Sequence, residues 1–188
     1  MSGAKLNLAK SSVLSLIESL DDTHSMTLIN FDSEASIFSL TSAGFYEDVI
    51  YSSLVAANKS FDATKNSYPD QYTFYCRNDT HTVVSEYFDS LNSTYGTIAN
   101  ITRAVEAATI LDDYVRYDKI IPENNLSMII LLTDGRSASG NKTEVIGKQI
   151  RVLNKVNRIP IFSIGIGFDA NTEFLEDIAG LLLSLFRV

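Results

Sequence analysis

The feature that most constrains the fold of this chain is the segment Ser127–Gly135, with the sequence SMIILLTDG. Every residue from Met128 to Thr133 is apolar or β-branched, and Asp134 and Gly135 end the run. A short apolar run followed by turn residues is typical of a strand buried on both faces, as in a parallel sheet covered by helices. Ligands of open α/β sheets bind beyond the carboxyl ends of the strands. We therefore expect Asp134 at that edge of a central strand.

The length and charge of the chain exclude several classes of protein. Its 188 residues suffice for one domain with a hydrophobic core. A formal net charge of -8 argues against nucleic-acid binding, which needs a basic face. No apolar run approaches the ~20 residues of a membrane span, and the N-terminus lacks the pattern of a signal peptide.

Histidine and cysteine are scarce, which limits the chemistry that the chain can support. With two histidines and one cysteine, a zinc site or a Ser-His-Asp triad has few residues to draw on. Cys76 cannot form a disulfide within the chain. It is therefore either a free thiol or half of a bridge to a group outside this chain.

The N-terminal part predicts a helix and then an antiparallel pair of strands. Apolar residues recur on one helical face, with Ser2 as a plausible N-cap; they are Leu6, Ala9, Val13, Leu16, Ile17 and Leu20. Residues 24–31 and 35–40 predict two strands, and the polar turn between them favours antiparallel pairing.

The pattern is looser from residue 41 to about residue 81. Residues 45–57 predict a helix, and residues 58–80 predict an exposed loop with a short strand at 72–75. A further helix is expected at residues 82–91, with Tyr87 and Phe88 buried.

Strands and helices alternate in the remainder of the chain. A helix containing Ile101, Val105 and Leu111 precedes the central strand, and helices near residues 144–157 and 173–183 flank a buried strand at 160–166. This alternation implies parallel pairing with right-handed crossovers.

Five segments, in this order, resemble a von Willebrand factor type A domain, most closely those of inter-alpha-trypsin inhibitor heavy chains and calcium-channel alpha-2/delta subunits. They are MSGAKLNLAKSSVLSLIESL, YGT, LLTDG, IPIFSIGIGFD and FLEDIAG. The resemblance implies a single domain over residues 1–188, with an insertion at about 41–81. It also implies an α/β fold with a doubly wound, mostly parallel sheet and helices on both faces.

The resemblance implies a metal-ion-dependent adhesion site at the carboxyl edge of the sheet. By position, Thr97 and Asp134 correspond to two of the family's metal-site residues. Hydroxyl and carboxylate oxygens suit Mg²⁺, Ca²⁺ or Mn²⁺. The partner would be a protein that presents a carboxylate to the ion.

The sequence also departs from the family. The family's DxSxS segment would immediately precede or overlap Met1, and the sequence does not contain it. We therefore expect a domain that lacks the family's first strand and its last, either truncated at both ends or missing flanking segments in its gene model. Two residues of the metal site would then bind an ion weakly or not at all.

Simpler roles compete with these assignments. Asp134 could accept backbone N–H bonds in its loop, and Thr97 could cap the following helix. Six Asn-x-Ser/Thr sequons favour an extracellular glycoprotein, with Asn100 an awkward acceptor beside Thr97. The other five, which remain possible N-glycosylation sites, are Asn58, Asn78, Asn92, Asn125 and Asn141.

Three hypotheses for the function follow. The preferred one is a non-enzymatic, adhesion-type protein-binding module of the cell surface or extracellular space. The second is a structural remnant of such a domain without metal-dependent binding. The third is an α/β enzyme that uses Asp134 as nucleophile or general base, which the sequence disfavours because it offers no second carboxylate in DxD spacing, no candidate catalytic histidine and no phosphate loop.

Overall fold

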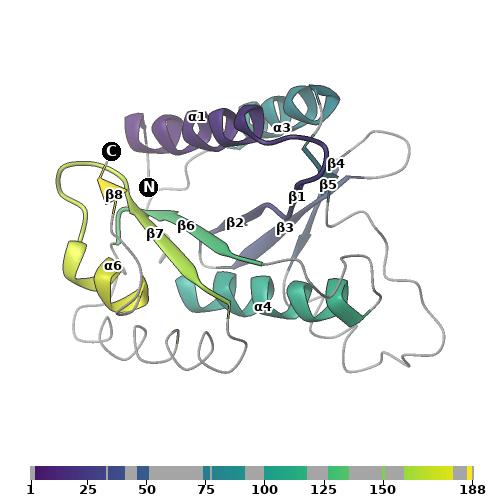
Figure 1. Cartoon of the computed structure of the whole chain (residues 1–188). Helices are drawn as coiled ribbons and strands as arrows, with labels where there is room; N and C mark the ends of the chain where they lie inside the picture. The colour runs from purple at the N-terminus through teal and green to yellow at the C-terminus, as the bar shows by residue number, and fades with distance from the viewer. Residues whose placement is uncertain are drawn as a thin grey trace.

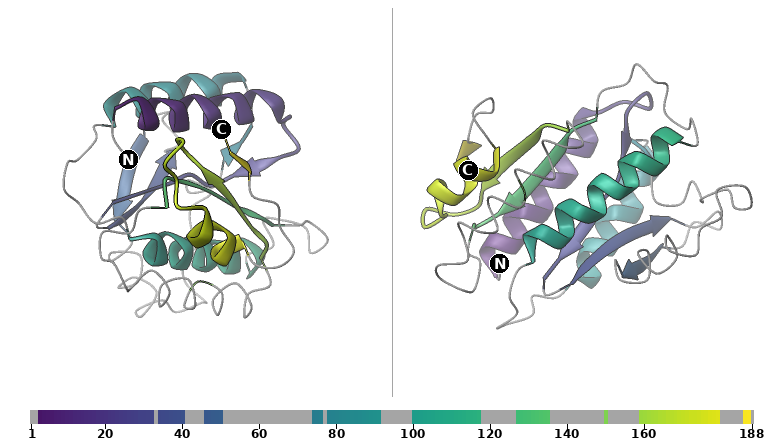
Figure 2. Two further views of the ribbon diagram at one scale, coloured as in Figure 1. Left: turned by 90° about the vertical axis from the view of Figure 1, so that its left-hand side faces the viewer. Right: turned by 90° about the horizontal axis from the view of Figure 1, so that it is seen from below.

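The strands form a layer between two pairs of helices, as Figure 1 shows, with α1 and α3 on one side and α4 and α6 on the other. Figure 2 shows the same layers from two further directions. The computed structural model describes residues 3–32, 34–40, 46–50, 74–76, 78–91, 100–117, 127–135, 150, 159–179 and 186–187. The layers confirm the predicted α/β class with helices on both faces of the strands.

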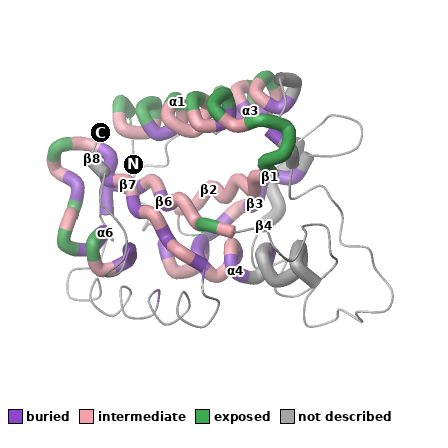
Figure 3. Tube along the Cα trace, in the orientation of Figure 1, coloured by how far each residue is buried: buried purple, intermediate pink, exposed green. Residues whose placement is uncertain are grey.

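Helices α1 (Ala4–Ser19) and α3 (Asn78–Ser90) lie side by side over one face of the strands. The N-cap of α1 is Gly3, which offers no side-chain cap, so the assignment of Ser2 to that position is wrong. Helix α3 starts at Asn78, earlier than the predicted residue 82, and residues 78–80 are therefore helical. Figure 3 shows the exposed positions of α1 on the side away from the strands.

The predicted strand at residues 24–31 is two short strands, β1 (Ser25–Met26) and β2 (Ile29–Phe31). Strand β1 pairs with β5 (Phe74–Tyr75), whereas β2 pairs with β3 (Ala35–Leu40); both pairings are antiparallel. The chain changes partner between the two, which a local pattern does not reveal. The predicted antiparallel pair and the short strand near residues 72–75 are confirmed.

Strand β4 (Tyr46–Ile50) contradicts the helix predicted at residues 45–57. It pairs antiparallel with β3, with Tyr46 opposite Leu40 and Ile50 opposite Ser36. The tyrosine and the β-branched residues of this segment are also good strand formers, and pairing with β3 decides between the two structures. Residue 45 and residues 51–57 lie outside the described residues.

Both faces of β3 are covered, because its side chains alternate. Ala35 and Ile37 pack with residues of α4 (Ile101–Tyr117). Phe38 packs on the opposite face with residues of α1 and α3, including Tyr87 at a ring-centroid distance of 4.9 Å. A strand buried on both sides in this way belongs to the centre of a layered domain.

The second half of the chain forms a parallel sheet. Strand β6 (Ile129–Thr133) pairs with β7 (Ile161–Gly165), and β7 pairs with β8 (Phe186–Arg187). The parallel pairing predicted for this region is confirmed. Strand β8 follows α6 (Thr172–Ala179), so the expectation that no strand follows the last helix is wrong.

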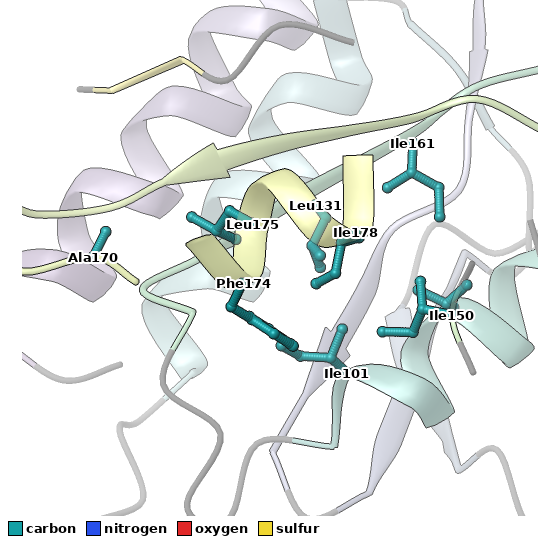
Figure 4. Close-up of a cluster of buried hydrophobic side chains, with 9 residues drawn as sticks. Ile101, Leu131, Ile150, Ile161, Ala170, Phe174, Leu175 and Ile178 are labelled. Atoms are coloured by element: carbon teal, nitrogen blue, oxygen red, sulfur yellow. The ribbon is translucent and has the colours of Figure 1, made fainter. Parts of the chain in front are cut away.

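The main core lies between the parallel sheet, α4 and α6, as Figure 4 shows. Phe174 and Ile178 of α6 meet Leu131 of β6 there, and all three are buried. Strand β6 is fully buried only at Leu131 and Thr133, whereas its remaining residues are half-buried. The predicted burial of β6 on both faces is therefore correct for the face that carries Leu131 and Thr133, and the opposite face is only half-buried. The full cluster is Ile101, Val105, Leu131, Ile150, Ile161, Ala170, Phe174, Leu175 and Ile178.

Candidate functional site

The candidate site lies where β6 and β7 end. The N–H of Ile166 donates to the carbonyl of Thr133 at 3.0 Å, which extends the pairing of the two strands by one bond. The N–H of Asn171 then donates to the carbonyl of Asp134, also at 3.0 Å. These bonds join the turn after β6 to the loop after β7, and they place Asp134 at the predicted edge.

Glycine is required directly after Asp134. Gly135 has φ 67°, a left-handed conformation that side chains disfavour. A Cβ at this position would lie 3.0 Å from the carbonyl oxygen of Asn171. The close approach of the two loops therefore depends on the missing side chain.

The loop after β7 is anchored at the start of α6. The side chain of Asn171 caps this helix, because its Oδ1 accepts a hydrogen bond from the N–H of Phe174 at 3.1 Å. Phe174 itself is buried in the main core. Packing of α6 thus holds the loop that faces Asp134.

Asp134 is buried, with 8% of the residue exposed, and its carboxylate faces an ammonium group. The Nζ atom of Lys5 lies 3.8 Å from Oδ2 of Asp134 and 2.5 Å from Oδ1 of Asp169. The three residues come from the first turn of α1, the end of β6 and the loop after β7. Carboxylates at low exposure need such partners, because burial of an isolated charge is costly.

The start of α4 lies against the end of β2. The N–H of Asn100 donates to the carbonyl of Asp32 at 2.5 Å, and its side-chain Oδ1 accepts from the N–H of Arg103 at 3.2 Å. Asn100 is therefore the N-cap of α4, the role considered above for Thr97. Thr97 lies outside the described residues.

The described residues do not by themselves fit a divalent ion. Among them, no group of at least three His, Cys, Asp or Glu side chains gathers where it could hold a metal. Mg²⁺ and Ca²⁺ take six or more oxygen ligands, whereas Asp134 shares its surroundings with a positive side chain. An ion here would need further oxygens from outside the described residues.

Sequence reasoning missed Lys5 and Asp169. Asp169 follows the kind of signal that identified Asp134, because it comes shortly after a buried strand, whereas Lys5 lies in the first turn of a predicted helix and carries no such signal. Their meeting point depends on how α1 packs, which no local pattern reports.

Cys76 is buried, with 4% of the residue exposed, and is a free thiol. Burial raises the pKa of this thiol, and the nearby charge of Asp21 adds to the effect. The N–H of Cys76 donates to the carbonyl of His24 at 3.0 Å. A bridge to another chain would therefore require this end of the structure to open.

The glycosylation candidates are placed only in part. Asn78 is the first residue of α3. Asn58, Asn92, Asn125 and Asn141 lie outside the described residues. No helix in the described part of the chain is both long and apolar enough to cross a membrane.

Comparison with known proteins agrees with the fold and order of these elements. The family model of the von Willebrand factor type A domain matches residues 66–181. Heavy chain 4 of the inter alpha-trypsin inhibitor of Mus musculus is 38% identical over 81 residues, which is 43% of this chain and 8% of that protein. The chain thus spans less than a tenth of this relative, and the resemblance to inter-alpha-trypsin inhibitor heavy chains is confirmed.

Two solved structures share the fold. The BatB protein of Bacteroides thetaiotaomicron has a TM-score of 0.53 and 17% identity, over 97% of this chain and 79% of that one. The manganese-loaded TRAP protein of Plasmodium vivax has a TM-score of 0.50 and 16% identity, over 95% and 60%. The segment that the family model matches, residues 66–181, extends from before α3 to the end of α6 and includes β6, Asp134 and β7. The chain belongs to the von Willebrand factor type A domain family.

Proposed function

We propose that this domain binds protein partners at the carboxyl edge of β6 and β7, and that it is not an enzyme. Domains of this family are generally protein-interaction modules. The observation that carries the proposal is the buried carboxylate of Asp134 at a strand end, held by a turn that requires Gly135. A charged group kept at low exposure at such an edge favours a binding role over a solvated surface.

In the metal-dependent form of this proposal, Thr97 and Asp134 contribute oxygen ligands to Mg²⁺, Ca²⁺ or Mn²⁺. The ion supplies a positive charge for the carboxylate of a partner protein. The oxygen chemistry of both side chains supports this form. Support also comes from the similarly folded TRAP protein, which was crystallised loaded with manganese.

The second candidate is a structural domain of this family without metal-dependent binding. The specific observation in its favour is the Lys5 ammonium 3.8 Å from the Asp134 carboxylate. A lysine already compensates the charge that an ion would otherwise compensate.

Titration calorimetry with Mg²⁺, Ca²⁺ and Mn²⁺ separates the two candidates. In the metal-dependent form we expect weak binding, with Kd of about 0.1–1 mM, in the range of extracellular calcium modules. Asp134→Ala should abolish it. Asp22→Ala is the matched control, because Asp22 is an exposed carboxylate beyond the opposite end of α1.

Heat of binding that Asp134→Ala removes and Asp22→Ala retains supports the metal-dependent form. If the wild-type protein gives no heat of binding at millimolar ion, the structural candidate is supported. Equal binding by the wild type and both variants would place the ion elsewhere and contradict the role of Asp134.

An extracellular or cell-surface location is part of the proposal. It is supported by the sequons at Asn58, Asn78, Asn92, Asn125 and Asn141. The protein for the titration is made in animal cells with an added secretion signal. A mass decrease after N-glycosidase treatment of that sample shows use of the sequons, and an unchanged mass contradicts it.

A further inference from the structure

We propose that the Lys5 side chain is the resident cation of the binding edge, bound between Asp134 and Asp169. A divalent ion and the seated Lys5 ammonium exclude each other. The inference rests on the proposed function where it concerns the ion, since it describes how that site is regulated. The position of Lys5 itself stands independently of any ion.

The geometry of the three charges carries the inference. The Nζ atom is 2.5 Å from Oδ1 of Asp169, an oxygen that is buried from solvent. The same Nζ is 3.8 Å from Oδ2 of Asp134. The exposed fractions of the side chains are 25% for Lys5, 12% for Asp134 and 28% for Asp169, so water screens this group less than it screens a surface pair.

The backbone beneath Lys5 accommodates its side chain. Gly167 has φ 96°, and a Cβ there would lie 2.8 Å from Cε of Lys5 and 3.4 Å from Cδ. The apolar stem therefore lies directly over a residue without a side chain. This close fit distinguishes Lys5 from a surface lysine that samples many rotamers.

The charge of the group explains why the ion and the ammonium compete. Two carboxylates and one ammonium leave a net charge of -1, from the charges of the three groups. The ammonium charge of Lys5 is thus already compensated by the two carboxylates. Because the group as a whole is negative, it does not attract the carboxylate of a partner. A divalent ion bound by Asp134 would be repelled by the Lys5 ammonium that contacts the same carboxylate. Lys5 must swing out before the edge can present an ion.

The first test compares ion binding by the wild type, Lys5→Met and Lys5→Arg. Met keeps much of the apolar stem and removes the charge, whereas Arg keeps the charge. We expect Lys5→Met to bind Mg²⁺, Ca²⁺ or Mn²⁺ about tenfold or more tightly than the wild type, because the positive charge beside the Asp134 carboxylate is gone. Lys5→Arg should remain weak.

Lys10→Met is the matched control. It removes the same charge from the same helix, but Lys10 donates to the carbonyls of Phe88 and Leu91, and not to this edge. Its ion affinity should equal that of the wild type. Thermal unfolding of each variant confirms that it is folded before the titration.

The second test requires no ion. Limited acetylation of lysines, followed by peptide mass spectrometry, measures the reactivity of the Lys5 amine. A paired ammonium reacts slowly, so the rate at Lys5 should rise several-fold in Asp134→Asn and again in Asp134→Asn/Asp169→Asn. Asp22→Asn serves as the control that should leave the rate unchanged.

The outcomes separate this inference from the proposed function. Equal ion affinity in the wild type and Lys5→Met overturns the inference while the metal-dependent function stands. If neither the wild type nor Lys5→Met gives a heat of ion binding, and the acetylation rate of Lys5 depends on the two carboxylates, a resident cation is supported and the metal-dependent function is contradicted. If the acetylation rate of Lys5 is the same in the wild type, in Asp134→Asn and in the double variant, the inference is overturned whatever the titration shows.

Discussion

The parallel half of the domain and its antiparallel half reach the same layered fold in different ways. In the parallel half, β7 alternates buried and half-buried residues, and α6 follows it to cover the same core. In the antiparallel half, β3 pairs with its sequence neighbours β2 and β4, but the helices α3 and α4 that cover its two faces come from much later in the chain. The helix α6 that covers the parallel strands therefore directly follows β7 in the chain, whereas the helices that cover β3 are distant from it in sequence.

This difference matters for the candidate site. The parallel half supplies Asp134 and Asp169 on loops anchored by β6, β7 and α6. The positive charge comes from α1, which packs against α3 and the antiparallel strands. The charge balance at the edge thus depends on how the two halves are docked.

The largest expected effects come from the cores of the two halves. Ile178→Ala in the parallel half and Phe38→Ala in the antiparallel half each remove a side chain that is 0% exposed. We expect losses in the free energy of unfolding of about 2–5 kcal/mol for Ile178→Ala and about 3–5 kcal/mol for Phe38→Ala. Urea denaturation measures both.

Two results would break this comparison. A loss below about 1 kcal/mol in either variant would mean that the side chain is not buried as described. Separate unfolding transitions for the two halves would show that they fold independently. Leu8→Ala is the control, because Leu8 is an exposed residue of α1.

A smaller effect is expected at the contact between α1 and α3. Lys10 donates to the carbonyl of Phe88 and, at 2.8 Å, to the carbonyl of Leu91 at the end of α3. A cation at a helix C-terminus interacts favourably with the unpaired carbonyls and the helix dipole. Lys10→Met should therefore lower the free energy of unfolding by about 1–2 kcal/mol, as measured in urea.

Lys10→Arg is the control that keeps the charge at the end of α3. It should recover part of the loss seen with Lys10→Met. If both variants are as stable as the wild type, the hydrogen bonds from Lys10 do not stabilise the pairing of α1 with α3.

The smallest effect concerns the turn after α1. The pKa of Asp21 is lowered to about 2 from its ordinary 3.8, mainly by the side-chain hydrogen bond from Thr23 and next by the one from His24. The folded pKa is depressed, so the stabilisation is present above pH 3.8 and is lost as pH falls through about 2. Because Asp21 is fully exposed, the change in stability should be slight.

Carboxyl ¹³C NMR during an acid titration measures the Asp21 pKa directly. In Thr23→Val the pKa should move toward 3.8, because the side-chain donor is lost. A wild-type value already at 3.8 would show that these hydrogen bonds do not form in solution.

Sequence patterns predicted the parallel half more accurately than the antiparallel half. The end of β6 directly before Asp134, the strand β7 and the helix α4 follow from local runs of apolar residues and their spacing. The helix predicted at residues 45–57 was wrong where the structure describes β4, because pairing with β3 overrides a weak helical spacing. The single strand at residues 24–31 was wrong because β1 and β2 have different partners.

The sequence by itself determined where a carboxylate would stand, because an apolar run that stops at Asp134-Gly135 is a property of neighbouring residues. Only the tertiary structure decided what that carboxylate meets. Lys5 is 129 positions before Asp134 in the chain, and the packing of α1 brings its ammonium to within 3.8 Å of the carboxylate. Electrostatic interaction depends on distance in space and on burial, and neither is encoded in a local pattern.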